Sequence, residues 1–200
     1  MKHIIYILLL AFCPLATLQA DNLTPIVSVV PCPVQMVPGT GNFLFSGSTV
    51  LRVENAEQAR VARNFVNLFT RATPVLKTGK GKGDVCFVTD PLLKSEAYRL
   101  SVSPEQISIE ASDAKGFFYA LQTIRQLLPP DIENSRTVNA MWTVPCLTIQ
   151  DEPRFGFRGL LLDPVRCFIP KKNVLRIIDC MAMLKINKLH FHLTLSLIHI

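Results

Sequence analysis

The sequence predicts an α+β domain over residues 21–150, followed over residues 151–200 by the first strand–helix–strand portion of a parallel sheet. Two observations carry this prediction. In the first segment, strand-like and helix-like runs follow one another without strict alternation, as in α+β domains. In the second, a fully apolar strand leads through a loop and an amphipathic helix to another strand, as in a sheet covered on both faces. The polar residues 131–139 separate the two patterns.

The first 20 residues have the layout of a secretory signal peptide, with cleavage expected after Ala20. A basic start leads into an uninterrupted apolar run over residues 4–13, which is shorter than the roughly 20 residues needed to span a bilayer. We therefore expect an exported protein, either periplasmic or extracellular. Two alternatives stay open: a buried N-terminal helix, and lipid attachment at Cys13 that anchors the protein at the cell surface.

Charge and cysteine content narrow the function classes. Without residues 1–20, the chain has 20 basic and 15 acidic residues, a net charge of +5. The basic residues are scattered rather than interleaved with aromatic ones, so we expect no nucleic-acid partner. Five cysteines remain, an odd number without a Cys-x-x-Cys pair, which excludes a complete set of disulfides and disfavours a zinc or redox motif. Most of them lie in apolar runs, where we expect small buried side chains.

The α+β domain is predicted from short apolar runs bounded by Pro and Gly, together with two amphipathic helices. The predicted strands are 34–37, 42–45, 49–53, 85–89, 98–102, 106–110 and 144–149, with 98–102 and 106–110 forming a hairpin. One helix covers residues 57–72, and a second begins with Ser112 or Asp113 as its N-cap. Residues 78–83 are predicted to be a turn, because the Gly-Lys-Ser/Thr ending of a phosphate-binding loop is missing.

The second segment predicts strands at 159–162 and 188–194 around a helix at 171–184. One such unit cannot bury its own faces, so the pattern implies further strands and helices. In a parallel barrel the working residues lie just beyond the C-terminal ends of the strands. Asp163 and Arg166 have that position after the first strand.

Arg166 is a candidate ligand-binding residue, because its guanidinium can present several donors to hydroxyls or a carboxylate. The alternative is that Arg166 pairs with Asp163 and fixes the loop. His190 and His192 lie on one face of the second predicted strand, where His-x-His can ligate a metal, as in metal-dependent hydrolases. The alternative for both is a packed histidine bonded to neighbouring loops.

Three ordered motifs give the chain a family resemblance. Residues 151–166 (Asp-Glu-Pro-Arg-Phe-Gly-Phe-Arg-Gly-Leu-Leu-Leu-Asp-Pro-Val-Arg) and 185–194 (Lys-Ile-Asn-Lys-Leu-His-Phe-His-Leu-Thr) resemble the opening of the catalytic barrel in family 20 glycoside hydrolases, the β-N-acetylhexosaminidases. Residues 116–127 resemble the last helix of the α+β domain that precedes that barrel. The resemblance thus implies an N-terminal fragment in which an α+β domain precedes a truncated (β/α)8 TIM barrel.

The resemblance also implies an activity. Family members are exo-acting, remove terminal N-acetylhexosamine from β-linked glycans with retention, and use the substrate's acetamido oxygen as nucleophile. We expect no metal and no cofactor. The resemblance assigns to Arg166 the binding of hydroxyls of the terminal sugar, and to Arg158, Asp163, His190 and His192 supporting roles beneath the sugar site.

The chain departs from the family pattern at two places. Cys167 stands where the family usually has His. After Thr194 the family has two aspartates, whereas residues 195–200 are mostly apolar here, so they are suspected to be non-native. The family's catalytic Asp-Glu pair is expected far downstream, and we therefore expect the 200 residues alone to be inactive. The alternative functions are a non-enzymatic sugar-binding or scaffold protein and a metal-dependent hydrolase.

Overall fold

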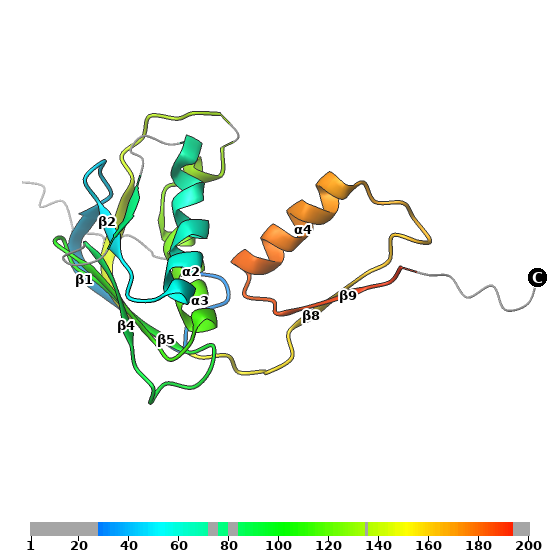
Figure 1. The fold of residues 1–200 in the computed structure, drawn as a ribbon, viewed down its shortest axis with the longest axis horizontal. Coiled ribbons are helices and arrows are strands. Elements are labelled where there is room, and N and C mark those ends of the chain that lie inside the picture. The colour runs from blue at the N-terminus through cyan, green and yellow to red at the C-terminus, as the bar shows by residue number, and fades with distance from the viewer. Residues whose placement is uncertain (1–27, 72–75, 80–83, 135, 194–200) are drawn as a thin grey trace, which may run out of the picture.

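The computed structural model describes residues 28–71, 76–79, 84–134 and 136–193. Within them the chain forms a seven-stranded mixed sheet, two helices on one face of this sheet, and a unit of two strands and one helix beside them (Figure 1). The predicted signal peptide, residues 1–20, lies outside the described residues. No helix in the described ranges combines the length and apolarity needed to cross a membrane.

The large sheet has the strand order β1-β7-β5-β6-β4-β2-β3. Its antiparallel half pairs β1 with β7, β7 with β5, and β5 with β6, and its parallel half pairs β6 with β4, β4 with β2, and β2 with β3. The strands are β1 (Gln35–Leu44), β2 (Val50–Arg52), β3 (Lys77–Gly79), β4 (Val85–Thr89), β5 (Tyr98–Val102), β6 (Ile107–Ala111) and β7 (Thr143–Asp151). The predicted hairpin is confirmed as β5 and β6.

The first two predicted strands, 34–37 and 42–45, are in fact one strand, β1. Its register against β7 shifts between Pro38 and Asn42, which marks a β-bulge. Gly41 lies in this bulge with a φ of +94°, a conformation that glycine adopts without strain. The Pro and Gly residues thus bend a continuous strand instead of ending one.

The predicted turn at 78–83 is also wrong in part. Residues 78–79 belong to β3, which pairs parallel with β2 at the sheet edge, whereas 80–83 lie outside the described residues. The predicted helix 57–72 is confirmed as α2 (Ala56–Val66), which continues as the 3-10 helix η1 (Asn67–Arg71).

Each long helix on the sheet begins at a side-chain cap. The Asn55 carboxamide oxygen accepts the Gln58 N–H at 2.9 Å at the start of α2. Asp113, one of the two predicted caps, accepts the Gly116 N–H at 2.9 Å at the start of α3 (Ala114–Leu127). Both bonds satisfy N–H groups that have no partner inside their helix. A second short 3-10 helix, η2 (Pro130–Glu133), follows α3.

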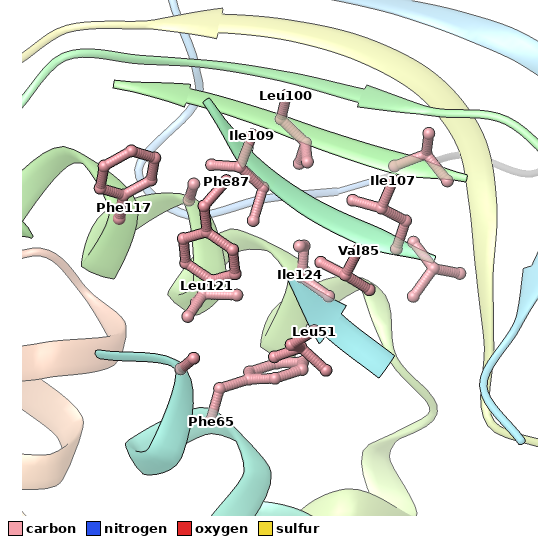
Figure 2. Packing of buried hydrophobic residues seen from close by; sticks show 14 of the residues in the cluster. Leu51, Phe65, Val85, Phe87, Leu100, Ile107, Ile109, Phe117, Leu121 and Ile124 are labelled. Atoms are coloured by element: carbon pink, nitrogen blue, oxygen red, sulfur yellow. The ribbon is translucent and has the colours of Figure 1, made fainter. Parts of the chain in front are cut away.

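The core lies between the sheet and these helices (Figure 2). Alternate residues of β5 and β6 point inward, as a period of two requires. One face of α3 meets them with residues four or three apart. The labelled members of the cluster in Figure 2 are Leu51, Phe65, Val85, Phe87, Leu100, Ile107, Ile109, Phe117, Leu121 and Ile124.

The second unit consists of β8 (Gly159–Leu162), α4 (Lys171–Met183) and β9 (Lys188–Phe191). The two strands pair parallel, as predicted, with Gly159 opposite Lys188. Strand β9 ends at Phe191, earlier than the predicted residue 194. Within α4, Met181 alone is buried, and α4 contacts α3 of the first domain.

Much of the apolar surface of the second unit is exposed. Its large exposed apolar residues include Leu161, Phe168, Leu175, Ile178, Leu184, Phe191 and Leu193, with exposed fractions of 36% to 82%. This agrees with the expectation that one strand–helix–strand unit cannot bury its own faces.

The cysteine prediction holds only in part. In the described ranges every cysteine is a free thiol. Cys86 and Cys146 are buried in the sheet domain, as expected. Cys32, Cys167 and Cys180 are exposed, so the expectation of burial is wrong for these three.

Candidate functional site

The C-terminal end of β8 carries the candidate site, and Asp163 organises it. Its Oδ1 accepts the backbone N–H groups of Val165 at 3.1 Å and Arg166 at 3.2 Å. The N–H of Arg166, helped by His192, holds the pKa of the Asp163 carboxyl below its usual value. The carboxylate thus folds the loop after β8 into a tight turn and stays ionised at neutral pH.

Arg166 projects from this turn into solvent. Its Nε lies 3.4 Å from Asp163 Oδ2, and its side chain is 79% exposed. The predicted alternative, an ion pair with Asp163, is therefore present. The pair engages Nε and leaves most of the guanidinium accessible, so pairing and ligand binding are compatible. An exposed ion pair of this kind contributes little stability.

His192 joins the end of β9 to the same cluster. Its backbone N–H donates to the Leu162 carbonyl at 2.9 Å, and its Nδ1 lies 3.2 Å from Asp163 Oδ1. His190 lies two residues earlier in β9, opposite Leu161, and is exposed. In the part of the chain that the structure describes, no group of three or more His, Cys, Asp or Glu side chains could hold a metal ion.

Arg158 lies at the opposite end of β8, where the second unit meets the sheet domain. Its Nε donates to the Lys185 carbonyl at 2.7 Å, and its two terminal nitrogens donate to the Phe155 carbonyl and to Glu96. The Arg158 guanidinium also stands 5.5 Å from the centre of the Tyr119 ring. Arg158 therefore ties the start of β8 to the first domain rather than joining Asp163 and Arg166.

A second set of polar side chains meets Arg158 there. Lys185 follows the C-cap of α4 and is 6% exposed, and its Nζ donates to Asp151 Oδ2 at 2.7 Å and to Tyr98 Oη at 2.9 Å. Burial lowers the pKa of the Lys185 ammonium, and the Asp151 carboxylate opposes this shift. Burial also raises the pKa of the Tyr98 hydroxyl far above its usual range, so the hydroxyl stays protonated.

We call this set the junction cluster; it comprises Glu96, Tyr98, Tyr119, Asp151, Arg158, Lys185 and Asn187. A cavity of about 430 Å³ opens beside it. The sequence interpretation missed every member except Arg158. One signal was available: a Lys at the end of a predicted helix, between apolar stretches, has a long side chain that needs a partner.

Of the predicted site residues, the structure brings together Asp163, Arg166 and His192. Arg158 is at the other end of β8 and His190 is within β9, apart from the turn. The cluster at the C-terminal ends can donate and accept hydrogen bonds to hydroxyl groups. It lacks a buried carboxylic acid whose pKa could be raised for general acid catalysis, so its geometry suits the binding of a ligand.

Two models of known protein families match the two parts of the chain. Residues 27–152 match the model of glycosyl hydrolase family 20, domain 2, and residues 155–196 match that of the family's catalytic domain. The chain belongs to glycosyl hydrolase family 20.

Relatives and solved structures agree with this assignment. A beta-hexosaminidase of Porphyromonas gingivalis is 35% identical over 84% of the chain, which covers 22% of that protein. A beta-N-acetylhexosaminidase of Cellulomonas fimi is 33% identical over 85% of the chain and 35% of its own length. The structure of a Streptomyces plicatus beta-hexosaminidase with GlcNAc superposes with a TM-score of 0.77 at 35% identity, covering 83% of this chain and 34% of that one. The chain thus spans a fifth to a third of these proteins.

Proposed function

We propose that residues 28–193 are the α+β domain and the beginning of the catalytic (β/α)8 barrel of an exported, exo-acting β-N-acetylhexosaminidase. One observation carries the proposal: the parallel β8–β9 pair presents Asp163, Arg166 and His192 together at its C-terminal end. This is the end at which (β/α)8 enzymes bind their substrates. The layout of residues 1–20 supports export, and N-terminal sequencing of the mature protein should then begin at Asp21.

The proposed substrate is a β-linked glycan that ends in N-acetylhexosamine. The exposed guanidinium of Arg166 suits sugar hydroxyls, because its planar donors can contact two neighbouring oxygens at once. Asp163 fixes the backbone of Arg166 through its turn and so limits the directions in which the side chain can point. The similar S. plicatus beta-hexosaminidase holds GlcNAc as a product in its structure, which supports this class of sugar.

The proposed mechanism is substrate-assisted hydrolysis with retention, in which the acetamido oxygen of the substrate attacks the anomeric carbon. The described residues supply binding groups for the sugar and no general acid. Asp151 and Glu152 do form an Asp-Glu dipeptide, but they pair with Lys185 and Lys94 at the junction side of the unit. We therefore propose that the 200 residues alone do not hydrolyse glycosides.

The test compares the 200-residue chain with a complete enzyme that begins with residues 1–194, using a chromogenic N-acetylglucosaminide. We expect hydrolysis by the complete enzyme alone. In that enzyme Arg166→Ala should lower kcat/KM by roughly 10- to 100-fold, the size of losing hydrogen bonds to a charged group. Arg176→Ala on exposed α4 is the matched control and should leave kcat/KM unchanged. Equal losses in both variants, or activity of the 200 residues, contradict the proposal.

A further inference from the structure

Two residues of the junction cluster have an unusual backbone. In the described ranges, Glu96 with a φ of 69° and Lys185 with a φ of 58° are the non-glycine residues with positive φ. This left-handed region is unfavourable for a residue with a Cβ. Such residues persist where the surroundings over-determine them, and they often mark a functional constraint. Both strained positions occur at the contact between the sheet domain and the second unit.

Lys185 occupies a position that usually belongs to glycine. It follows the C-cap of α4, where the Lys185 N–H donates to the Ala182 carbonyl at 3.1 Å and the next N–H donates to Met181 at 2.8 Å. Helices commonly end at such a site with Gly, because Gly adopts the left-handed conformation freely. Here the backbone turn directs a long side chain inward, where its ammonium contacts Asp151 and Tyr98. A glycine could end the helix here without strain, but it could not make these two contacts.

Glu96 makes the corresponding contact from the sheet domain. Its Oε2 accepts from Arg158 at 2.6 Å, and its Oε1 accepts from the Asn187 amide at 3.3 Å. The side chains of Glu96 and Arg158 are 12% and 17% exposed. Asn187 also accepts the Arg158 N–H through its own Oδ1 at 3.0 Å. One carboxylate therefore contacts the residues that precede β8 and β9 at the same time.

We propose that Glu96 and Lys185 are positioning residues, which fix the N-terminal ends of β8 and β9 to the sheet domain. They thereby set the strand register that brings Asp163, Arg166 and His192 together at the other end. The attachment stands on the geometry of the junction cluster alone. Its consequence for sugar binding rests on the proposed function.

Short strands make this transmission effective. A four-residue strand spans about 10 Å, at ~3.3 Å per residue. Over that length, the bonds of the Asn187 and Lys188 N–H groups to the Arg158 carbonyl at one end and the bond of the His192 N–H to the Leu162 carbonyl at the other belong to one pair of strands. Loss of the contacts at the start of β9 should therefore affect the candidate site at the other end of the strand, because no hinge lies between them.

The test measures amide hydrogen exchange by NMR in the 200-residue chain and needs no enzymatic activity. Lys185→Met keeps much of the side-chain length and removes the charge, which leaves Asp151 buried without its main partner. We expect exchange at His192, whose N–H donates to Leu162 across the two strands, to rise roughly 100-fold or more, the effect of breaking a buried ion pair. Amides of β5 and β6 should change much less, and emission of Trp142, buried in the sheet domain, should report that this domain is folded.

Three further variants separate positioning from simple helix capping. Lys185→Gly relieves the backbone strain. Exchange at His192 should therefore become slower if Lys185 only ends α4. It should become faster if the Lys185 ammonium fixes the strands. Lys185→Arg should restore part of the protection. Lys94→Met is the matched control, because Lys94 pairs with the neighbouring Glu152 but is 77% exposed.

The outcomes are decisive in both directions. Slower exchange in Lys185→Gly than in the unmodified chain overturns the proposal, and so does an equal rise throughout β5 and β6 in Lys185→Met. Should Lys185→Met not fold, Glu96→Gln breaks one ion pair with an isosteric side chain and must show the same local rise at His192. A failure of the glycosidase assay alone refutes the proposed function and leaves these exchange results standing.

Discussion

Replacement of Gly116 by Ala tests how α3 is seated on the sheet. A Cβ at this position lies 2.4 Å from the Ala97 carbonyl oxygen and 2.8 Å from the Ala111 Cβ. Helix propensity favours the substitution by ~0.8–1 kcal/mol. Steric overlap opposes it, and overpacking of a dense interior typically costs about 1–3 kcal/mol. Neither contact is the far end of a flexible side chain, so the helix itself must shift and the steric cost should reach the upper part of that range.

We therefore expect Gly116→Ala to lower the free energy of unfolding by about 1–2 kcal/mol after the propensity gain is subtracted. The assay is urea denaturation followed by the emission of Trp142, the only tryptophan of the chain. Gly156→Ala is the control, because a Cβ there meets nothing within 4 Å, and its effect should stay within about 0.5 kcal/mol. A Gly116→Ala chain as stable as the unmodified one refutes the reasoning.

Three more outcomes are expected. Asp113→Ala removes the cap that accepts the Gly116 N–H and should cost about 1 kcal/mol in the same denaturation assay. Arg125 donates hydrogen bonds to Asp179 and holds the pKa of that carboxyl below its usual value. The stability that this ion pair contributes is therefore complete above roughly pH 4, and it is lost as the pH falls through the lowered pKa of the folded state. A pH titration of unfolding should show that loss, and Asp179→Asn should reduce it. Arg166→Ala should leave stability within about 0.5 kcal/mol, because the side chain is 79% exposed.

The sequence predicted those elements whose signal is local. The β5–β6 hairpin follows from two alternating runs around a short polar turn, and α3 follows from an N-cap and one apolar face. The β8–α4–β9 unit follows from an apolar strand, a crossover helix and a second strand. Each of these patterns lies within about 35 consecutive residues or fewer, so it can be recognised from the sequence without knowledge of distant contacts.

The junction cluster could not be predicted, because its contacts join distant parts of the chain. Lys185 and Tyr98 are 87 positions apart, and Glu96 and Asn187 are 91 apart. Lys185 also has a left-handed backbone without the glycine that normally signals it. The candidate site differs, because its contact is local: Asp163 and Arg166 are three residues apart, so their spacing alone indicated the ion pair.

Hydrogen bonds at the junction have a physical role that apolar packing could not fill. The β8 strand contains the run Leu160, Leu161, Leu162, in which every position is apolar. In such a strand a slip of one residue exchanges one leucine for another, so hydrophobic contact specifies the register weakly. Hydrogen bonds differ in this respect, because a slip of about 3.3 Å breaks them outright. Arg158 and Asn187 exchange such bonds between the two strand starts: the Arg158 N–H donates to Asn187 Oδ1 at 3.0 Å, and the Asn187 N–H donates to the Arg158 carbonyl at 2.9 Å.

The same slip would also move the candidate site. With β9 shifted by one residue, the His192 N–H no longer faces the Leu162 carbonyl, and its imidazole turns to the other face of the strand. The turn at Asp163 would then lose one of its partners, although its own backbone bonds to Val165 and Arg166 are local and would survive. The register fixed at one end of the strands therefore decides whether His192 joins Arg166 at the other, while the fold of the Arg166 loop is independent of it.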